Sequence, residues 1–292
     1  MALTNDNLIE KYLEINNKKV VSYYIFKSNC HSEKQINIIF IHGLGGNKLV
    51  FVNLIDKILN SSNGKIDINA IIVDLIGHGK SINLNGLREY SYISQSNFIK
   101  KIIDIEFEKH AKLNIFGHCY GSFVAIKLAN MISNKVNQLF LVASNPYIQK
   151  SAKLQFKVSQ NLFIKYLIYT IFKVAKSNKN LQDFDYKQYR DSQDYDIKRL
   201  FMDVKYTSIK GYLGSLYQLL YSSVFDDYNE LQKNKIPICL IHGKKDTIFP
   251  YNEIIHNTKN DKIELIPINK SNHLPVFNSV RELSNILTHK FM

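Results

Sequence analysis

A five-residue turn is the clearest candidate for chemistry in this sequence. It reads Gly117-His118-Cys119-Tyr120-Gly121, with a glycine two residues before the cysteine and another two residues after it. Residues 113–116 before it predict a buried strand, and residues 122–129 after it predict a helix. In such a strand–turn–helix the middle side chain stands above the sheet, and the glycines let neighbouring backbone approach closely. Cys119 is therefore the candidate nucleophile.

The elements that must position this turn are short apolar runs separated by helical patterns. Strands are expected at 36–41, 69–73, 113–116, 139–143, 236–241 and 262–267. Residues 9–26 alternate apolar and polar side chains, which predicts two antiparallel strands at one sheet edge. Strands that alternate with helices lie parallel. The predicted fold class is α/β, with a mostly parallel central sheet and helices on both faces.

Two further residues with catalytic side chains each follow a predicted strand. Asp246 lies in the loop after 236–241, and His273 lies in the loop after 262–267. A parallel sheet brings the carboxyl ends of its strands to one edge, so Cys119, Asp246 and His273 are expected to meet there. His273 would take or share the thiol proton, while Asp246 would orient the imidazole and stabilise its charged form.

The turn around Cys119 resembles the G-x-S-x-G nucleophile elbow of the α/β-hydrolases, with sulfur in place of oxygen. His42-Gly43-Leu44-Gly45-Gly46 resembles the HG loop of that family, and residues 74–81 resemble its D-x-x-G-x-G-x-S turn. The order nucleophile, acid, base is also the family's own, and the resemblance spans nearly the whole chain. It implies an oxyanion hole formed by the backbone N–H groups of Leu44 and Tyr120.

A change of composition marks the stretch from 145 to 227, which is rich in Tyr, Phe and Lys and shows helical spacing at 162–173. The resemblance implies a helical lid here, so we expect a first part of the core at 1–146, a lid insertion at 147–229 and a second part of the core at 230–292. An aromatic, cationic helix could instead lie on a membrane surface. We favour the lid, because Lys165 and Lys173 break up the apolar stripe and a lid also needs an apolar face toward the core.

The remaining reactive side chains are interpreted as structural. Asp74 precedes Cys119 in the sequence, whereas the acid of the family's triad follows the nucleophile. If Asp246 is not the acid, Asp226 and Asp227 are the alternatives to test. Ser122 lies three residues past Cys119 on a helix and would point elsewhere, and Cys239 lies inside a strand. Four histidines lie next to a glycine, namely His42, His78, His118 and His242. They do not have the spacing of metal ligands, so we expect neither a metal nor a cofactor.

The resemblance implies acyl transfer through a covalent acyl-enzyme. We expect a carboxylic ester or thioester hydrolase with a Cys-His-Asp triad. An acyltransferase or cyclase is the first alternative, because amines attack a thioester more readily, relative to water, than they attack an oxygen ester. A ligand-binding protein without turnover is the second. The acyl group, the leaving group and the oligomeric state stay open at this stage.

Charge and cysteine content bound the partners and the compartment. The formal charge of +13 suits a substrate carried by coenzyme A or by a carrier protein, but the lysines are scattered, so we expect no nucleic-acid partner. Three cysteines, Cys30, Cys119 and Cys239, are too few for a disulfide framework and favour a reducing interior. The start of the chain has no signal pattern, and no apolar run approaches ~18 residues. A soluble, cytoplasmic protein is expected.

Overall fold

The computed structural model describes residues 7–28, 32, 34–147, 161–175, 193–194, 197, 201, 203, 206–259 and 261–292. Cys30 lies outside these residues, and so do the parts of the expected lid insertion (147–229) that these ranges do not include. None of the helices in the described ranges combines the length and the apolar character that a membrane crossing requires.

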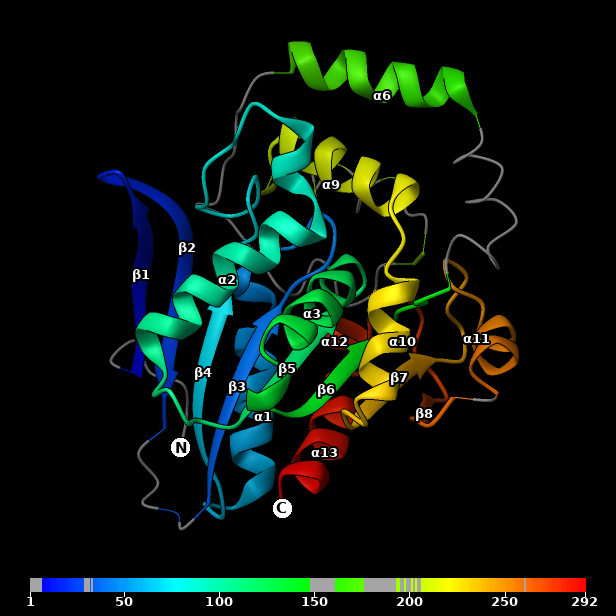
Figure 1. Ribbon diagram of the computed structural model, residues 1–292. Helices are drawn as coiled ribbons and strands as arrows, with labels where there is room; N and C mark the ends of the chain where they lie inside the picture. The colour runs from blue at the N-terminus through cyan, green and yellow to red at the C-terminus, as the bar shows by residue number, and fades with distance from the viewer. Residues whose placement is uncertain are drawn as a thin grey trace.

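Within the described residues, eight strands form one sheet in the order β1-β2-β4-β3-β5-β6-β7-β8 (Figure 1). The strands are β1 (Leu8–Ile15), β2 (Lys18–Lys27), β3 (Gln35–Ile41), β4 (Asp67–Val73), β5 (Leu113–His118), β6 (Val136–Val142), β7 (Ile238–Gly243) and β8 (Glu264–Ile268). Each expected strand is present. The strand expected from 236 begins only after Pro237, a residue that has no N–H to donate to a sheet.

The sheet is parallel from β4 to β8 and antiparallel at the β1 edge. The prediction of an antiparallel pair at one edge is therefore confirmed. In β3 the side chains of Ile39 and Ile41 enter the core on one face, while Ile38 and Phe40 enter the core on the other. Burial on both faces explains why this strand is an almost continuous apolar run rather than an alternating one.

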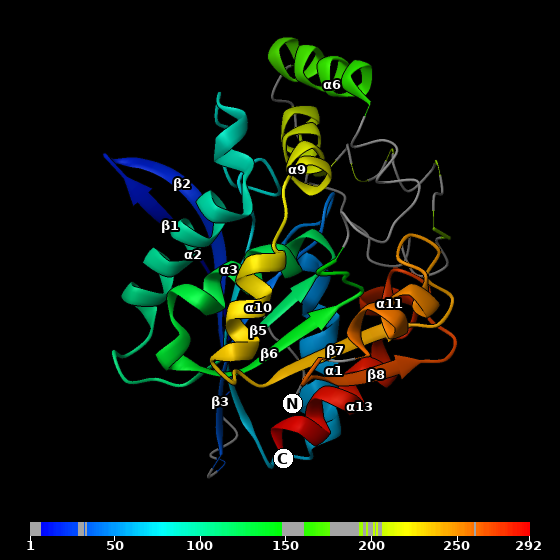
Figure 2. The ribbon, with the colours of Figure 1, turned by 45° about the vertical axis from the view of Figure 1, so that its right-hand side comes forward.

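Helices cover both faces of the sheet, as the α/β fold class predicts. One face carries α2 (Tyr92–Glu106), α3 (Tyr120–Met131) and α10 (Phe225–Lys233), and the other carries α1 (Val52–Ser62) and α13 (Val280–Phe291) (Figures 1 and 2). Two short helices, α11 (Tyr251–Thr258) and α12 (Pro275–Asn278), follow β7 and β8. Short 3-10 helices occupy Lys48–Phe51, Leu87–Tyr90 and Ser133–Lys135.

Two helices lie above the carboxyl edge of the sheet. These are α6 (Leu162–Val174) and α9 (Ile209–Tyr221), and α6 packs on α9 at the top of Figure 1. We call this pair the outer layer. Both helices are capped by side chains, since Asn161 accepts from the N–H of Ile164 and Ser208 accepts from the N–H of Gly211. The expected boundary at residue 229 falls within α10, and the division into core and lid stays a prediction.

Candidate active site

The turn at Cys119 is a strained elbow between β5 and α3. Cys119 has φ 52° and ψ −120°, a left-handed conformation that residues with a side chain rarely adopt. Its N–H donates to the carbonyl of Val142 at 3.0 Å, and its carbonyl accepts from the N–H of Ser122 at 2.9 Å. The ends of β6 and α3 therefore hold the elbow in place, and the thiol lies at the carboxyl edge of the sheet.

Both glycines of the elbow are required by close backbone contacts, as the sequence predicts. A Cβ at Gly117 would lie 2.6 Å from the carbonyl oxygen of Gly121, and a Cβ at Gly121 would lie 2.3 Å from the carbonyl oxygen of Ile41. A carbon atom cannot lie this close to a carbonyl oxygen, so any side chain at either position would force the backbone to move. The second contact brings the elbow against the end of β3, where the HG loop begins.

The HG loop passes directly beside the cysteine. A Cβ at Gly43 would lie 2.9 Å from the Cβ of Cys119. The buried ring of His42 fixes the loop, because its Nε2 accepts from the N–H of Leu75 at 3.1 Å and its Nδ1 donates to the carbonyl of Gly43 at 2.8 Å. Burial lowers the pKa of His42 to about 4, so this ring stays neutral and acts as a structural tie.

The expected oxyanion donors, Leu44 and Tyr120, flank the cysteine. Tyr120 is the first residue of α3, where backbone N–H groups have no acceptor inside the helix. Leu44 follows Gly43 in the loop that contacts Cys119. In the described part of the chain neither N–H donates to another backbone group. The Tyr120 side chain points away into the core, where its hydroxyl donates to the carbonyl of Tyr90.

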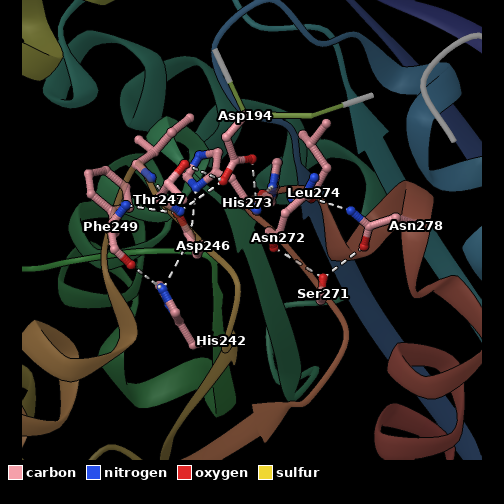
Figure 3. Close-up of polar contacts among 12 residues, drawn as sticks. Asp194, His242, Asp246, Thr247, Phe249, Ser271, Asn272, His273, Leu274 and Asn278 are labelled. Carbon is pink, nitrogen blue, oxygen red and sulfur yellow. Dashed lines mark hydrogen bonds and ion pairs between the residues drawn. The ribbon is translucent and has the colours of Figure 1, made fainter. Parts of the chain in front are cut away.

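Asp246 lies in the loop after β7, and four hydrogen-bond donors surround its carboxylate (Figure 3). Oδ1 accepts from the backbone N–H groups of Ile248 at 2.9 Å and Phe249 at 2.8 Å. Oδ2 lies 2.8 Å from Nδ1 of His273 and 3.1 Å from Nε2 of His242. Burial alone would raise the pKa of Asp246, but the two histidines outweigh it and hold the pKa well below its usual range. The side chain is therefore a carboxylate.

His273 lies between Asp246 and Cys119. It is 1% exposed, and the ring of Phe249 packs edge-on against it with centroids 5.2 Å apart. Its Nδ1 bonds Asp246, and a hydrogen bond links its ring to the Cys119 side chain. Burial would lower the pKa of His273, but the Asp246 carboxylate, the Cys119 side chain and their hydrogen bonds raise it to about 10. The structure thus brings Cys119, His273 and Asp246 together, as the order of the predicted strands requires.

Two polar side chains contact the candidate site although the sequence reasoning assigned them no role there. His242 is fully buried, and its Nε2 lies 2.8 Å from the carbonyl of Phe249 as well as beside Asp246. Its place four residues before Asp246 was the available signal. Asp194 comes from the expected insertion; it accepts from the N–H of His273 at 3.1 Å and from the N–H of Thr247 at 2.8 Å (Figure 3). Asp194 thereby joins the loop that carries Asp246 to the loop that carries His273.

Three of the side chains interpreted as structural form their hydrogen bonds and ion pairs with groups other than Cys119, His273 and Asp246. The Asp74 carboxylate binds the amine of the buried Lys48 at 2.7 Å and the backbone N–H of Lys80 at 2.9 Å. The Ser122 hydroxyl donates to the carbonyl of Gly117 at 2.7 Å. Asp227 pairs with Lys127 at 2.9 Å on the face of the sheet that carries α3.

Cys239 is buried in β7, and burial raises the pKa of its thiol to about 12. Among the described residues, no group of three or more His, Cys, Asp or Glu side chains is arranged to hold a metal ion. His118 donates from Nε2 to the carbonyl of His273 at 3.0 Å, which fixes the loop that carries His273. The absence of a cofactor stays a prediction.

A sheet of this order with a strained elbow and a Cys-His-Asp cluster at its carboxyl edge defines a class of protein. Residues 36–279 match the family described as the alpha/beta hydrolase fold. The chain therefore belongs to the α/β-hydrolase fold family, as the sequence motifs predict.

Proteins similar to this chain in sequence or in fold include esterases and a thioesterase domain. The pimeloyl-[acyl-carrier protein] methyl ester esterase of Wigglesworthia glossinidia brevipalpis is 30% identical over 243 residues, which are 82% of this chain and 85% of the relative. A carboxylesterase structure from the thaumarchaeon Nitrososphaera gargenis matches with a TM-score of 0.64 and 18% identity, covering 96% of this chain and 97% of the other. The thioesterase domain from the curacin biosynthetic pathway matches with a TM-score of 0.65 and 14% identity, covering 97% and 99%.

Proposed function

We propose that this chain hydrolyses a carboxylic ester or thioester with Cys119 as nucleophile, His273 as base and Asp246 as the acid that orients it. The observation that carries the proposal is the position of His273, which bonds Asp246 through Nδ1 and is hydrogen-bonded to Cys119. Covalent acyl transfer needs a nucleophile, a base and an orienting acid that are joined by a continuous chain of hydrogen bonds.

The resting site would hold a thiolate beside an imidazolium. The raised pKa of His273 favours its charged form at neutral pH. A thiol next to an imidazolium and at a helix N-terminus ionises more readily than a free thiol, whose pKa is about 8.5. Cys119 occupies such a place, since α3 begins at the next residue. The proton of the thiol then resides on His273, and Asp246 stabilises the positive charge.

Acylation begins when the Cys119 sulfur attacks the substrate carbonyl carbon. The carbonyl oxygen becomes an oxyanion, which the backbone N–H groups of Leu44 and Tyr120 would bind. The tetrahedral intermediate collapses as His273 gives its proton to the leaving alcohol or thiol, and a thioester acyl-enzyme remains. Water then gives a proton to His273 and attacks the thioester. The carboxylic acid leaves, and the thiolate and imidazolium are restored.

Carrier-linked esters are the substrate class that we infer. The relative from Wigglesworthia is named for a methyl ester on an acyl-carrier protein. The charge of +13 on this chain would attract an acidic carrier or a coenzyme A phosphate. A reducing cytoplasm, which the low cysteine content favours, would keep Cys119 in its reactive form.

The outer layer and the insertion around it would act as the lid. Asp194 bridges the loops of the acid and the base. A Cβ at Gly45 in the HG loop would lie 2.5 Å from the Asp203 carboxyl carbon. The insertion thus contacts the loops on both sides of Cys119, which is where a wall of the acyl pocket is needed.

Transfer of the acyl group to an amine or alcohol is the second candidate, and the sulfur of Cys119 favours it. An amine competes with water more effectively for a thioester than for an oxygen ester. Partition of a trapped acyl-enzyme between water and added amines separates the two activities: formation of amide in millimolar amine, at the expense of acid, would identify a transferase.

Intact-protein mass spectrometry tests the shared intermediate. The protein is exposed briefly to p-nitrophenyl esters and acyl thioesters of increasing chain length, in parallel with Cys119→Ala, His273→Ala and the control Cys239→Ala. We expect an acyl adduct that decays with time in the parent and in Cys239→Ala, and no adduct in Cys119→Ala. If the parent takes no label and turns over no substrate yet still binds small acyl ligands, the chain is a binding protein and the proposal fails.

A further inference from the structure

The helix α6 is apolar on the side that faces away from the protein. Ile168 and Phe172 are its two buried residues, one turn apart, and they pack toward α9 and the core. On another face, Phe163, Leu167, Ile171 and Val174 recur at steps of three and four residues and are all exposed. Phe163 is 72% exposed and Val174 is 75% exposed. Figure 2 shows α6 as the outermost helix above α9.

The outer layer carries only positive charge. Neither α6 nor α9 contains an aspartate or a glutamate, and together they contain Lys165, Lys173 and Lys210. The Lys173 amine lies over the ring of Tyr169 at 4.7 Å, on the exposed side of α6. The Lys165 amine lies over the ring of Tyr221 in α9 at 5.4 Å, and the Lys210 amine lies over the ring of Phe172 at 5.2 Å, so these two lysines flank the apolar face at the contact between the helices. An exposed apolar face with tyrosines and flanking lysines is the composition of helices that lie in the interface of an anionic membrane.

We propose that α6 docks on an anionic phospholipid surface. Its exposed apolar face would enter the boundary between headgroups and acyl chains, and its lysines would lie among the phosphates. The helix has 13 residues, about 20 Å of length, which suits a helix in the plane of the interface rather than across the bilayer. The proposal concerns binding alone and does not depend on the reaction at Cys119.

Protein partners fit this surface less well. A symmetric contact with a second copy would set the lysines of both outer layers against one another. An acidic carrier protein would need exposed ion-pairing groups, whereas four large apolar side chains dominate the outward face of α6. An anionic bilayer satisfies both features, because it offers an apolar layer directly beneath a layer of negative charge.

Vesicle sedimentation tests the proposal with the full chain. Vesicles of phosphatidylcholine alone are compared with vesicles that contain one quarter phosphatidylglycerol, for the parent, for Phe163→Glu/Leu167→Glu and for the control Ile105→Glu. Ile105 is also a large exposed side chain, 65% exposed, but lies on α2. We expect the parent and the control to bind the anionic vesicles, with the double variant bound at least tenfold more weakly. Neutral vesicles and high salt should also weaken binding by the parent.

Three outcomes would overturn the proposal. In the first, the parent does not sediment with anionic vesicles. In the second, the double variant binds as well as the parent while circular dichroism shows that both are folded. In the third, the parent is a dimer that Phe163→Glu/Leu167→Glu converts to a monomer without any binding to vesicles, which would identify α6 as an interface between copies of this chain.

Discussion

The candidate site around Cys119, His273 and Asp246 and the outer layer are built in opposite ways. Around Asp246 every carboxylate oxygen has two donors, and the backbone of Cys119 is tied to β6 and α3. In α6, two residues are buried and most of the large apolar side chains are exposed. The site is thus held by many interactions inside one core, whereas α6 leaves most of its large apolar side chains exposed. Catalytic geometry and partner choice should therefore respond to different mutations.

Replacement of the sulfur should have the largest effect. In Cys119→Ser we expect kcat/KM to fall by about 1,000-fold, because an alcohol does not ionise beside an imidazolium as a thiol does. Steady-state kinetics on the best p-nitrophenyl ester measure the change, with Cys239→Ala as the control that keeps parental activity. A Cys119→Ser variant as active as the parent would mean that the site does not depend on thiolate chemistry.

Truncation of two aromatic side chains should separate the core from the outer layer. Phe116 is fully buried in β5 against Phe40 and Phe51, and Phe116→Ala should cost about 4 kcal/mol of unfolding free energy. Phe172, packed edge-on against Tyr90, is as buried, but α6 packs on α9 outside the sheet, so we expect α6 to open locally before the core unfolds. We expect Phe172→Ala to cost less than about 2 kcal/mol in urea unfolding and to speed hydrogen exchange within α6. Equal costs would show that both regions unfold as one unit.

The Asp246–His273 pair should make stability depend on pH. The lowered pKa of Asp246 contributes stability above about pH 4, which is lost as the pH falls toward the folded-state pKa. The raised pKa of His273 contributes stability that is complete below about pH 6.5 and is lost as the pH rises toward 10. The pair therefore contributes most to the free energy of unfolding between about pH 4 and pH 6.5, by roughly 2 kcal/mol.

Urea unfolding of the parent and of His273→Ala from pH 3 to pH 10 measures this contribution. The difference between the two proteins should be greatest between about pH 4 and 6.5 and should shrink on both sides. A difference that does not change with pH would indicate only a packing role for His273.

His242 should act on the rate through Asp246. His242→Ala removes one of the two donors to Oδ2 of Asp246, so the carboxylate is held less firmly. We expect about a tenfold lower kcat with KM unchanged. His242→Gln retains an N–H donor and should recover most of kcat. If both variants lose equal activity and equal stability, His242 contributes through packing and not by positioning Asp246.

The smallest effect on stability is expected on the exposed face of α6. Phe163→Ala removes a side chain that is already in solvent, so the unfolding free energy should change by less than about 0.5 kcal/mol. The same variant should nevertheless bind anionic vesicles more weakly than the parent. A loss of stability above 1 kcal/mol would show that Phe163 packs against the protein, which would remove the contrast between the two regions.

Local patterns in the sequence were sufficient for the fold and for the expectation that Cys119, Asp246 and His273 lie together. The apolar runs 36–41 and 113–116 predict buried strands because a short, nearly continuous apolar run is a local feature of the sequence. The glycines of the elbow predict a turn that the structure confirms, with Cys119 at positive φ. Once the strands are parallel, the loops after β7 and β8 must meet the elbow at one edge, so the encounter of His273 with Cys119 follows from strand order.

Only the tertiary structure decided which polar groups support those residues and which apolar groups remain in water. The sequence could place His242 near Asp246, but the bond to Oδ2 depends on the path of the loop. Asp194 lies 52 positions before Asp246 and carries no periodic signal, yet it joins the two triad loops. The spacing in α6 predicts a helix, but exposure depends on what packs against each face. Long-range partners of this kind are fixed by packing, which no local pattern contains.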